Sequence, residues 1–321
     1  MRVSMADVAV RAGVSAQTVS RVANGSPRVD PATRARVEKA MADLGYRMHR
    51  AARALRTGQT STIGLVVSTL ASVGNSRMLQ AISEAAAARD YALAVVTVKE
   101  RGIRDAFARL SSQGVDGAVV LNEATELARD VEPPADLHLV VIDSPPDPRF
   151  SIVQTDHAAG ARAATEHLLS LGHDTVHHLA GPVRSFAAAE RERGWRAALV
   201  EVGATVPEPV RGDWTSASGH RAAGALVEAS AVFVANDQMA LGALRAFAEA
   251  GRRVPDDVAV VGFDDIVDAG EYRPPLSTVR QDFDALGVRV VVALIAAIEG
   301  GEPVAESVPT SLVVRESSVA G

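Results

Sequence analysis

The chain has 321 residues, 47% of them hydrophobic and 4% aromatic, which is too long for one small domain and enough for a large α/β core. It contains no cysteine, so it can form neither a disulfide nor a thiolate metal site. No apolar run reaches the length that spans a membrane, and the first motif begins at Ser4, where a secretion signal would lie. We therefore expect a cytoplasmic protein with no membrane partner.

Charge divides the chain into a basic head and an acidic body. Residues 1–60 hold 11 Lys and Arg against 4 Asp and Glu, a net of +7, whereas the whole chain carries a net of −6. The rest of the chain therefore carries a net of −13. This division favours a head that binds the phosphates of nucleic acid.

The first 25 residues predict two short helices joined by a glycine turn. Ser4 can cap the first helix, with Asp7 as its reciprocal partner, and Gly13 supplies the backbone angles of a tight turn. Ser15 is placed to cap the second helix. Two helices joined in this way form a helix-turn-helix, which fits a DNA groove. A plain helical hairpin with a solvated face is the alternative, and the basic charge of the head argues against it.

A third helix completes the predicted head. It begins at Asp30 and Pro31, a cap followed by proline in the first turn, and ends at Gly45. The predicted helix-turn-helix DNA-binding domain therefore covers residues 1–46.

Residues 47–60 are predicted to be a hinge helix and linker. The segment consists largely of alanine and arginine with one leucine, so it has too little apolar surface to fold alone. It is either a solvated linker or a hinge that becomes helical on DNA. In the second interpretation, which we adopt, Leu55 enters the minor groove and Arg53 meets a phosphate.

From residue 61 the pattern changes to alternating strands and helices. Apolar, strand-like runs occur in two sets, at 63–67, 92–96, 117–121 and 139–143, and then at 176–179, 231–235 and 258–263. Continuous apolar strands between helices indicate buried parallel sheets, so two α/β lobes are expected. Ligands of such sheets bind beyond the carboxyl ends of the strands, which predicts a ligand site in the cleft between the lobes.

Four motifs that follow one another along the chain carry a family resemblance. They are Val-Ser-x-Gln-Thr-Val-Ser-Arg-Val from residue 14, Leu-Ala-Gly-Pro from 179, Ala-Asn-Asp-Gln-Met-Ala-Leu-Gly from 235 and Val-Val-Gly-Phe-Asp-Asp from 260. Together they resemble the LacI/GalR family of bacterial transcriptional repressors, and within it the lactose-responsive members most.

The resemblance runs essentially from end to end and implies the whole architecture. It implies an N-terminal all-α helix-turn-helix head with a hinge helix, then a two-lobed α/β, periplasmic-binding-protein-like domain for effector binding and dimerisation at 61–321. The first lobe is expected at about 61–155 plus 283–306, and the second at about 156–282 plus 307–318.

The resemblance also implies a homodimer whose second helices read a near-palindromic double-stranded DNA operator. Gln17 and Arg21 match the base-reading positions of the family, and arginine can grip guanine O6 and N7 with two hydrogen bonds. Ala16 offers at most a methyl contact, which leaves the operator sequence open. The residues expected at DNA are Ser15, Ala16, Gln17, Thr18, Ser20, Arg21, Asn24, Arg28, Arg50, Arg53 and Leu55.

A sugar effector is implied for the cleft between the lobes. Planar polar side chains can bridge paired hydroxyls, and aromatic side chains can cover the ring faces of a sugar. The matching positions are Ser68, Asp143, Ser185, Arg191, Trp214, Asn236, Asp264 and Phe283. Purine-responsive members tend to carry aromatic residues just after the first strand, and residues 70–74 contain none, which favours a sugar. A galactoside is one candidate, and a different glycoside is another.

The expected activity is repression of carbohydrate-utilisation genes. Closure of the lobes on the sugar is predicted to weaken operator binding, so that the sugar acts as an inducer. The opposite sign, with the ligand as corepressor, stays the alternative.

Enzyme and carrier functions fit the sequence less well. There is no Gly-x-Ser-x-Gly elbow and no common glycine-rich phosphate loop. Five histidines lie between residues 157 and 178, but no His-Glu-x-x-His spacing occurs, and the adjacent pair 177–178 would point to opposite faces of a strand. An exported sugar carrier would have a secretion signal in place of the basic head. We expect no enzymatic activity, no cofactor and no metal.

Overall fold

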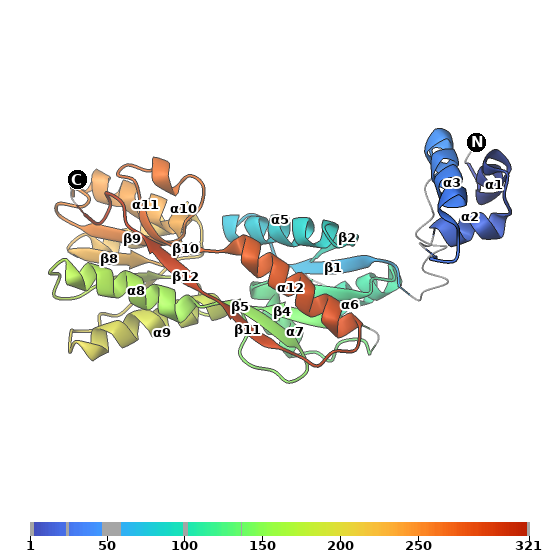
Figure 1. Ribbon diagram of the computed structural model, residues 1–321. Coiled ribbons are helices and arrows are strands. Elements are labelled where there is room, and N and C mark those ends of the chain that lie inside the picture. Colours follow the sequence, from blue (N-terminus) through green and yellow to red (C-terminus); the bar gives the residue numbers. More distant parts are fainter. Residues whose placement is uncertain (1–2, 24–25, 47–58, 99–101, 136, 320–321) are drawn as a thin grey trace. The chain divides into compact units, whose positions relative to one another are not determined.

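The structure is a computed structural model that describes residues 3–23, 26–46, 59–98, 102–135 and 137–319. The chain divides into two compact units, Met1–Ser61 and Thr62–Gly321 (Figure 1).

Three helices form the N-terminal unit, namely α1 (Met5–Ala12), α2 (Ala16–Ala23) and α3 (Pro31–Leu44). Apolar residues three or four positions apart in each helix meet in one small core. That core consists of Val8, Ala9, Ala12, Val19, Val22, Val37 and Ala40. The expected helix-turn-helix with a third helix is confirmed.

Local hydrogen bonds fix the ends of the first two helices. The Ser4 hydroxyl accepts the N–H of Asp7, and the Asp7 carboxylate accepts the N–H of Ser4 at 2.8 Å, which is the predicted capping box. Gly13 ends α1 with φ +66°, a left-handed conformation that a Cβ disfavours. At the start of α2 the Ser15 hydroxyl accepts the N–H of Thr18 at 3.1 Å.

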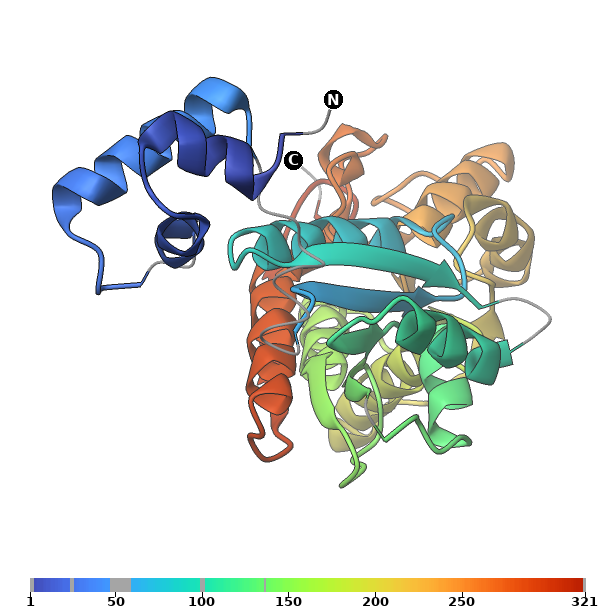
Figure 2. The same ribbon diagram turned by 90° about the vertical axis from the view of Figure 1, so that its right-hand side faces the viewer.

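A six-stranded parallel sheet forms the first lobe of the second unit. Its spatial order is β11 (Ala305–Val308), β5 (Ser151–Thr155), β4 (His138–Ile142), β3 (Gly117–Val120), β1 (Thr62–Val67) and β2 (Ala92–Thr97). Helices α5 (Val73–Ala87) and α12 (Phe283–Ile298) pack on one face, and α6 (Gly102–Ser112) and α7 (Glu123–Arg129) on the other. In Figure 2, β1 and β2 run side by side, as their parallel pairing requires.

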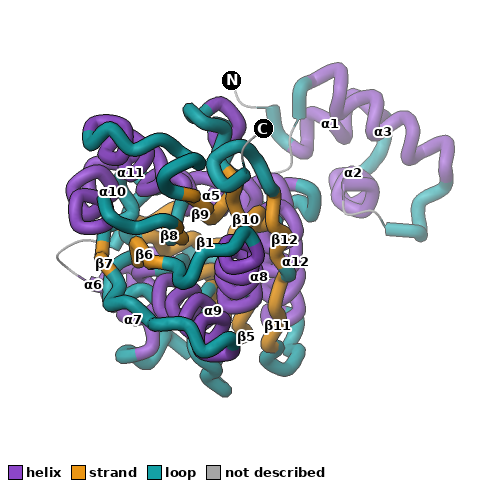
Figure 3. Tube along the Cα trace, turned by 90° about the vertical axis from the view of Figure 1, so that its left-hand side faces the viewer, coloured by secondary structure: helices purple, strands orange, loops and turns teal. Residues whose placement is uncertain are grey.

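The second lobe has a six-stranded sheet of related topology. Its order is β12 (Thr310–Val313), β10 (Ser277–Gln281), β9 (Ala259–Asp264), β8 (Ala231–Val234), β6 (His177–Ala180) and β7 (Val210–Arg211). Helices α8 (His157–Ser170) and α9 (Phe186–Glu201) cover one face, and α10 (Ser216–Ala223) and α11 (Asp237–Glu249) the other (Figure 3). The strand β12 pairs antiparallel with β10, so this sheet is not purely parallel.

The chain passes between the two sheets three times. The crossings join β5 to α8, β10 to α12, and β11 to β12. Because these segments lie at strand ends, they bring residues of both lobes to one place, where the cavity described below is found. Within the described part of the chain, no helix has both the length and the apolar character needed to cross a membrane.

Candidate functional site

A cavity that is open to solvent lies at the carboxyl ends of strands from both sheets, and its empty space, including the solvent at its mouth, is about 540 Å³. Of the residues expected at an effector, the following line it: Asp143, Ser185, Arg191, Trp214, Asn236, Asp264 and Phe283. Ser68 directly follows β1 but is not one of the lining residues. Lining residues that the sequence reasoning did not assign to an effector are Ser72, Gly74, Met78, Asn122, Ile142, Ala187, Gln281 and Leu286.

Four of the lining residues have unusual backbone conformations, and Asn122, with φ +45°, is the first of them along the chain. Asp143 has φ +54°, Trp214 has φ +74° and Asp264 has φ +115°. Residues with a Cβ rarely adopt positive φ, and such strained positions concentrate at functional sites. The surrounding fold therefore holds these side chains in orientations that a relaxed strand end would not give.

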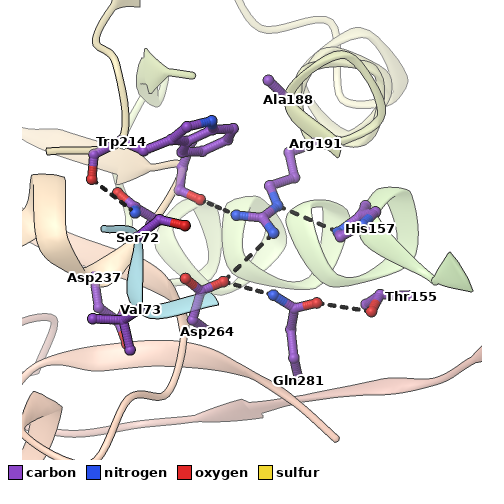
Figure 4. Close-up of polar contacts among 12 residues, drawn as sticks. Ser72, Val73, Thr155, His157, Ala188, Arg191, Trp214, Asp237, Asp264 and Gln281 are labelled. Carbon is purple, nitrogen blue, oxygen red and sulfur yellow. Dashed lines mark hydrogen bonds and ion pairs between the residues drawn. The ribbon is translucent and has the colours of Figure 1, made fainter. Parts of the chain in front are cut away.

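Arg191 lies at the centre of the second-lobe wall (Figure 4). Its side chain, from α9, is almost completely buried, and its Nε–H donates to Nδ1 of His157 at 3.3 Å. Its Nη2 lies 3.5 Å from Oδ1 of Asp264, and Nη1 donates to the carbonyl of Ala235. The guanidinium stacks 3.8 Å above the ring of Phe263. Burial lowers the pKa of Arg191, and the negative charge of Asp264 opposes that shift.

Asp264 is the last residue of β9 and the anionic partner of Arg191. Burial raises the pKa of Asp264, while the charge of Arg191 lowers it. The amide Nε2 of Gln281 donates to Oδ1 of Asp264 at 2.6 Å, and Oε1 of Gln281 accepts the hydroxyl of Thr155 at 2.7 Å (Figure 4). Gln281 thereby joins the charged pair to the first lobe.

Asn236 and Trp214 line the second-lobe wall and are joined by a hydrogen bond. Asn236 caps α11, accepting the N–H of Met239 at 3.0 Å, and its Nδ2 donates to the carbonyl of Trp214 at 3.1 Å. The Trp214 ring lies against Gly181, where a Cβ would come within 2.3 Å of a ring atom. Only glycine at 181 leaves room for the indole in this position.

Asp237 is a buried carboxylate next to the cavity that sequence reasoning did not assign. Its side chain accepts the hydroxyl of Thr278 at 2.6 Å and the N–H of Ile266 at 2.9 Å. Burial, and then the charge of Asp264, raise the pKa of Asp237 well above its ordinary value. Its bonds tie α11 to the end of β9 and to β10, so it supports the wall that carries Asp264.

The first-lobe wall combines apolar side chains with the carboxylate of Asp143 and one amide pair. Met78, Ile142 and Leu286 line it, while Asn122 donates from its amide to Oδ1 of Asn75. Asn75 is itself fully buried.

The described part of the expected DNA interface is the surface of α2 and the residues around it. Exposed residues are Ser15, Ala16, Gln17, Arg21 and Arg28; half-buried ones are Thr18 and Ser20. Four expected contacts lie outside the described residues, as does the hinge from 47 to 58; they are Asn24, Arg50, Arg53 and Leu55.

One residue of the histidine-rich stretch, His178, serves packing. His178 is fully buried, stacks on Phe233 with ring centroids 4.8 Å apart, and approaches Trp195 at 5.2 Å. Burial lowers the pKa of His178 to about 4, so the ring is neutral. Among the described residues, no group of three His, Asp or Glu side chains could hold a metal ion.

Known proteins match both units. The family described as "Bacterial regulatory proteins, lacI family" matches residues 4–48, and the "Periplasmic binding protein-like domain" matches residues 165–318. The lactose operon repressor of Escherichia coli (strain K12) is 37% identical over 332 residues, which cover 99% of this chain and 91% of that protein. The transcriptional regulator CelR of Thermobifida fusca is 38% identical over 339 residues, which cover 97% and 96%. The chain belongs to the LacI family.

Solved structures of LacI-family proteins have the same fold. The lac repressor dimer bound to operator and the anti-inducer ONPF superposes with a TM-score of 0.89 at 36% identity, covering all of both chains. A CelR–cellobiose complex superposes with a TM-score of 0.76 at 34% identity, covering 99% of this chain and all of that one. The expected family and fold class are confirmed, and the chain is a transcriptional regulator of the LacI family rather than an enzyme.

Proposed function

We propose that this LacI-family regulator represses carbohydrate-utilisation genes and is released from a near-palindromic operator by a sugar. The observation that carries the proposal is the shared cavity, in which Arg191 and Asp264 face the space between two α/β lobes. Its relatives support both halves of the proposal. The lac repressor structure holds operator and an anti-inducer, and the CelR structure holds cellobiose.

The chemistry of the cavity fits a sugar. Arg191 and Asp264 supply a donor and an acceptor for neighbouring hydroxyls, and charge-assisted hydrogen bonds of this kind are the strong ones. The ring of Trp214 and that of Phe283 line the same space and can cover the apolar faces of a pyranose.

The head supplies the DNA-binding half of the proposal. Gln17 and Arg21 are exposed on α2, where the helix-turn-helix presents side chains to the major groove. A homodimer would present two such helices to the two halves of the operator. Binding to chromosomal DNA places this activity in the cytoplasm.

Effector and operator are coupled by differential affinity. If the sugar binds better to the form of the body that binds DNA poorly, then operator must weaken sugar binding by the same factor. Operator affinity measured with and without saturating sugar gives the sign. Tighter operator binding in sugar would make the ligand a corepressor and contradict the proposal.

Thermal unfolding against a ligand panel tests the effector class. The panel contains lactose, cellobiose, ribose and purine bases, and the protein is the full chain. A ligand at roughly 100 times its Kd adds about 2.7 kcal/mol to the stability of the native state. A shift with one sugar that disappears in Asp264→Asn supports the proposal. A shift with a purine alone contradicts the sugar class and favours the purine-responsive alternative.

A further inference from the structure

Six residues form a closed ring of polar contacts where the chain crosses between the lobes. In order they are Asp143, His157, Arg191, Asp264, Gln281 and Thr155. The ring closes through the Thr155 N–H, which donates to Oδ1 of Asp143 at 3.3 Å. Asp143 and Thr155 end strands of the first sheet, and the other four belong to second-lobe elements. The ring therefore crosses between the lobes twice.

The contact between Arg191 and His157, within the second lobe, depends on the protonation state of His157. The Nε–H of Arg191 can only donate, so Nδ1 of His157, 3.3 Å away, must be an unprotonated acceptor. A neutral ring of this kind carries its proton on Nε2. That nitrogen lies 3.0 Å from Oδ1 of Asp143, a contact that is electrostatic because its angle falls short of a hydrogen bond. The His157 imidazole thus accepts a hydrogen bond from Arg191 of the second lobe and faces the carboxylate of Asp143 of the first lobe.

The surroundings of His157 leave little room for a different arrangement. The side chain is 2% exposed and lies beside the ring of Phe263, with centroids 5.9 Å apart. The charged groups that face it are Asp143 after β4, Arg191 on α9 and Asp264 at the end of β9, and Asp156 caps its own helix. A second proton on Nδ1 would set an N–H against the Nε–H of Arg191 and remove that hydrogen bond.

We propose that His157 is a positioning residue in the effector site. Its neutral imidazole holds Arg191 in place against Asp143 across the lobes, and protonation of that imidazole releases Arg191. The inference rests on the proposed function, because Arg191 is assigned there to the effector. Effector affinity then falls as the pH is lowered and His157 gains a proton. By linkage, effector binding releases a proton from those molecules in which His157 is protonated.

Calorimetric titration of the full chain with cellobiose and with lactose at pH 8 and pH 5.5 tests this. The expected result for the wild type is a loss of affinity at pH 5.5 of more than about twofold. His157→Gln cannot titrate, so its affinities at the two pH values should differ by no more than about twofold. His167→Gln, on the same helix but bonded to Ser318 at 2.9 Å, is the matched control and should keep the wild-type pH dependence. If His157→Gln keeps that dependence as well, the carboxylates cause it and the proposal is overturned.

A readout without effector separates this proposal from the sugar proposal. If neither disaccharide binds at pH 8, the sugar assignment fails for both probes. The protonation state of His157 and its contact with Arg191 can still be observed by ¹⁵N NMR of the histidine nitrogens and the Arg191 Nε–H. An Nε2–H tautomer at pH 8, with an Arg191 signal that shifts or broadens on acidification in the wild type and not in His157→Gln, supports the proposal. An Nδ1–H tautomer, or an Arg191 signal that does not respond to pH, overturns it.

Discussion

The two lobes contribute opposite chemistry to one cavity. The second-lobe wall is charged and hydrogen-bonded, with Arg191 and Asp264 at its centre, whereas the first-lobe wall is apolar around Met78 and Leu286 and carries the carboxylate of Asp143. Both walls come from strand ends of similar sheets and from the helices that follow those strands, so the shared fold supplies the position and the side chains supply the difference. The comparison suggests that the second lobe provides most of the binding free energy for a polar ligand and that the first lobe adjusts selectivity.

Replacing Arg191 by alanine removes the cation of the charged wall and should have the largest effect on sugar binding and on stability. The change leaves Asp264 buried without its cation, and removing one partner of a buried pair costs about 3–5 kcal/mol. We expect loss of the sugar-induced thermal shift together with a lower melting temperature. Arg193→Ala, at an exposed position of the same helix, is the control and should leave the sugar response intact. A full sugar response in Arg191→Ala would show that the second-lobe charge is not what binds the ligand.

The cores of the two lobes differ in acid sensitivity. Burial lowers the pKa of His178 from 6.5 to about 4, so the folded state binds its proton less readily than the unfolded chain. The contribution of His178 to the stability of the second lobe is therefore complete above pH 6.5 and is lost as the pH falls toward 4, by roughly 3 kcal/mol in all. Thermal unfolding between pH 7.5 and 5 should show this slope, and the slope should be smaller in His178→Phe, since burial also lowers the pKa of His167, His173 and His177. His138→Gln, at an exposed histidine of the first lobe, should keep the slope; a loss of the slope there would contradict the assignment to the second lobe.

Sequence patterns predicted the features that depend on neighbouring residues. The caps at Ser4 and Gly13 and the apolar strands followed local rules, and the polar side chains at strand ends were placed near the cleft by those rules and by the family resemblance. The strand β10 was missed because it reads Ser-Thr-Val-Arg-Gln and hides its polar groups in long-range hydrogen bonds. The link from Gln281 to Thr155 was missed for the same reason, since 126 residues separate the partners. Such contacts follow from the topology, which no local pattern contains.

Two glycines that line or border the cavity offer a smaller and better matched test of the comparison. A Cβ at Gly181 would come within 2.3 Å of the Trp214 ring, whereas a Cβ at Gly74 in the first lobe would meet nothing within 4 Å. Gly181→Ala should displace the indole, cost about 1–3 kcal/mol as overpacking does, and weaken sugar binding. Gly74→Ala, in helix α5, should bind normally and be about as stable as the wild type or slightly more so. Equal effects of the two changes on sugar affinity would remove the distinction between the walls.

The smallest expected effect belongs to the amide of the first-lobe wall. Asn122→Ala removes the hydrogen bond to Asn75, a neutral contact worth about 1 kcal/mol, and leaves the charged wall untouched. If the first lobe adjusts selectivity, the ratio of the cellobiose and lactose affinities should change by a few-fold, about what 1 kcal/mol allows, while at least one sugar still binds. Asn75→Ala is the informative partner, because it removes the same hydrogen bond, together with the bond from Asn75 Nδ2 to the carbonyl of Thr69, while keeping the Asn122 side chain that lines the cavity. The same change of ratio in both variants would assign the selectivity to the orientation of the Asn122 amide. A change in Asn122→Ala alone would assign it to direct contact with the sugar, and an equal loss of affinity for both sugars would show that the first lobe contributes general affinity instead.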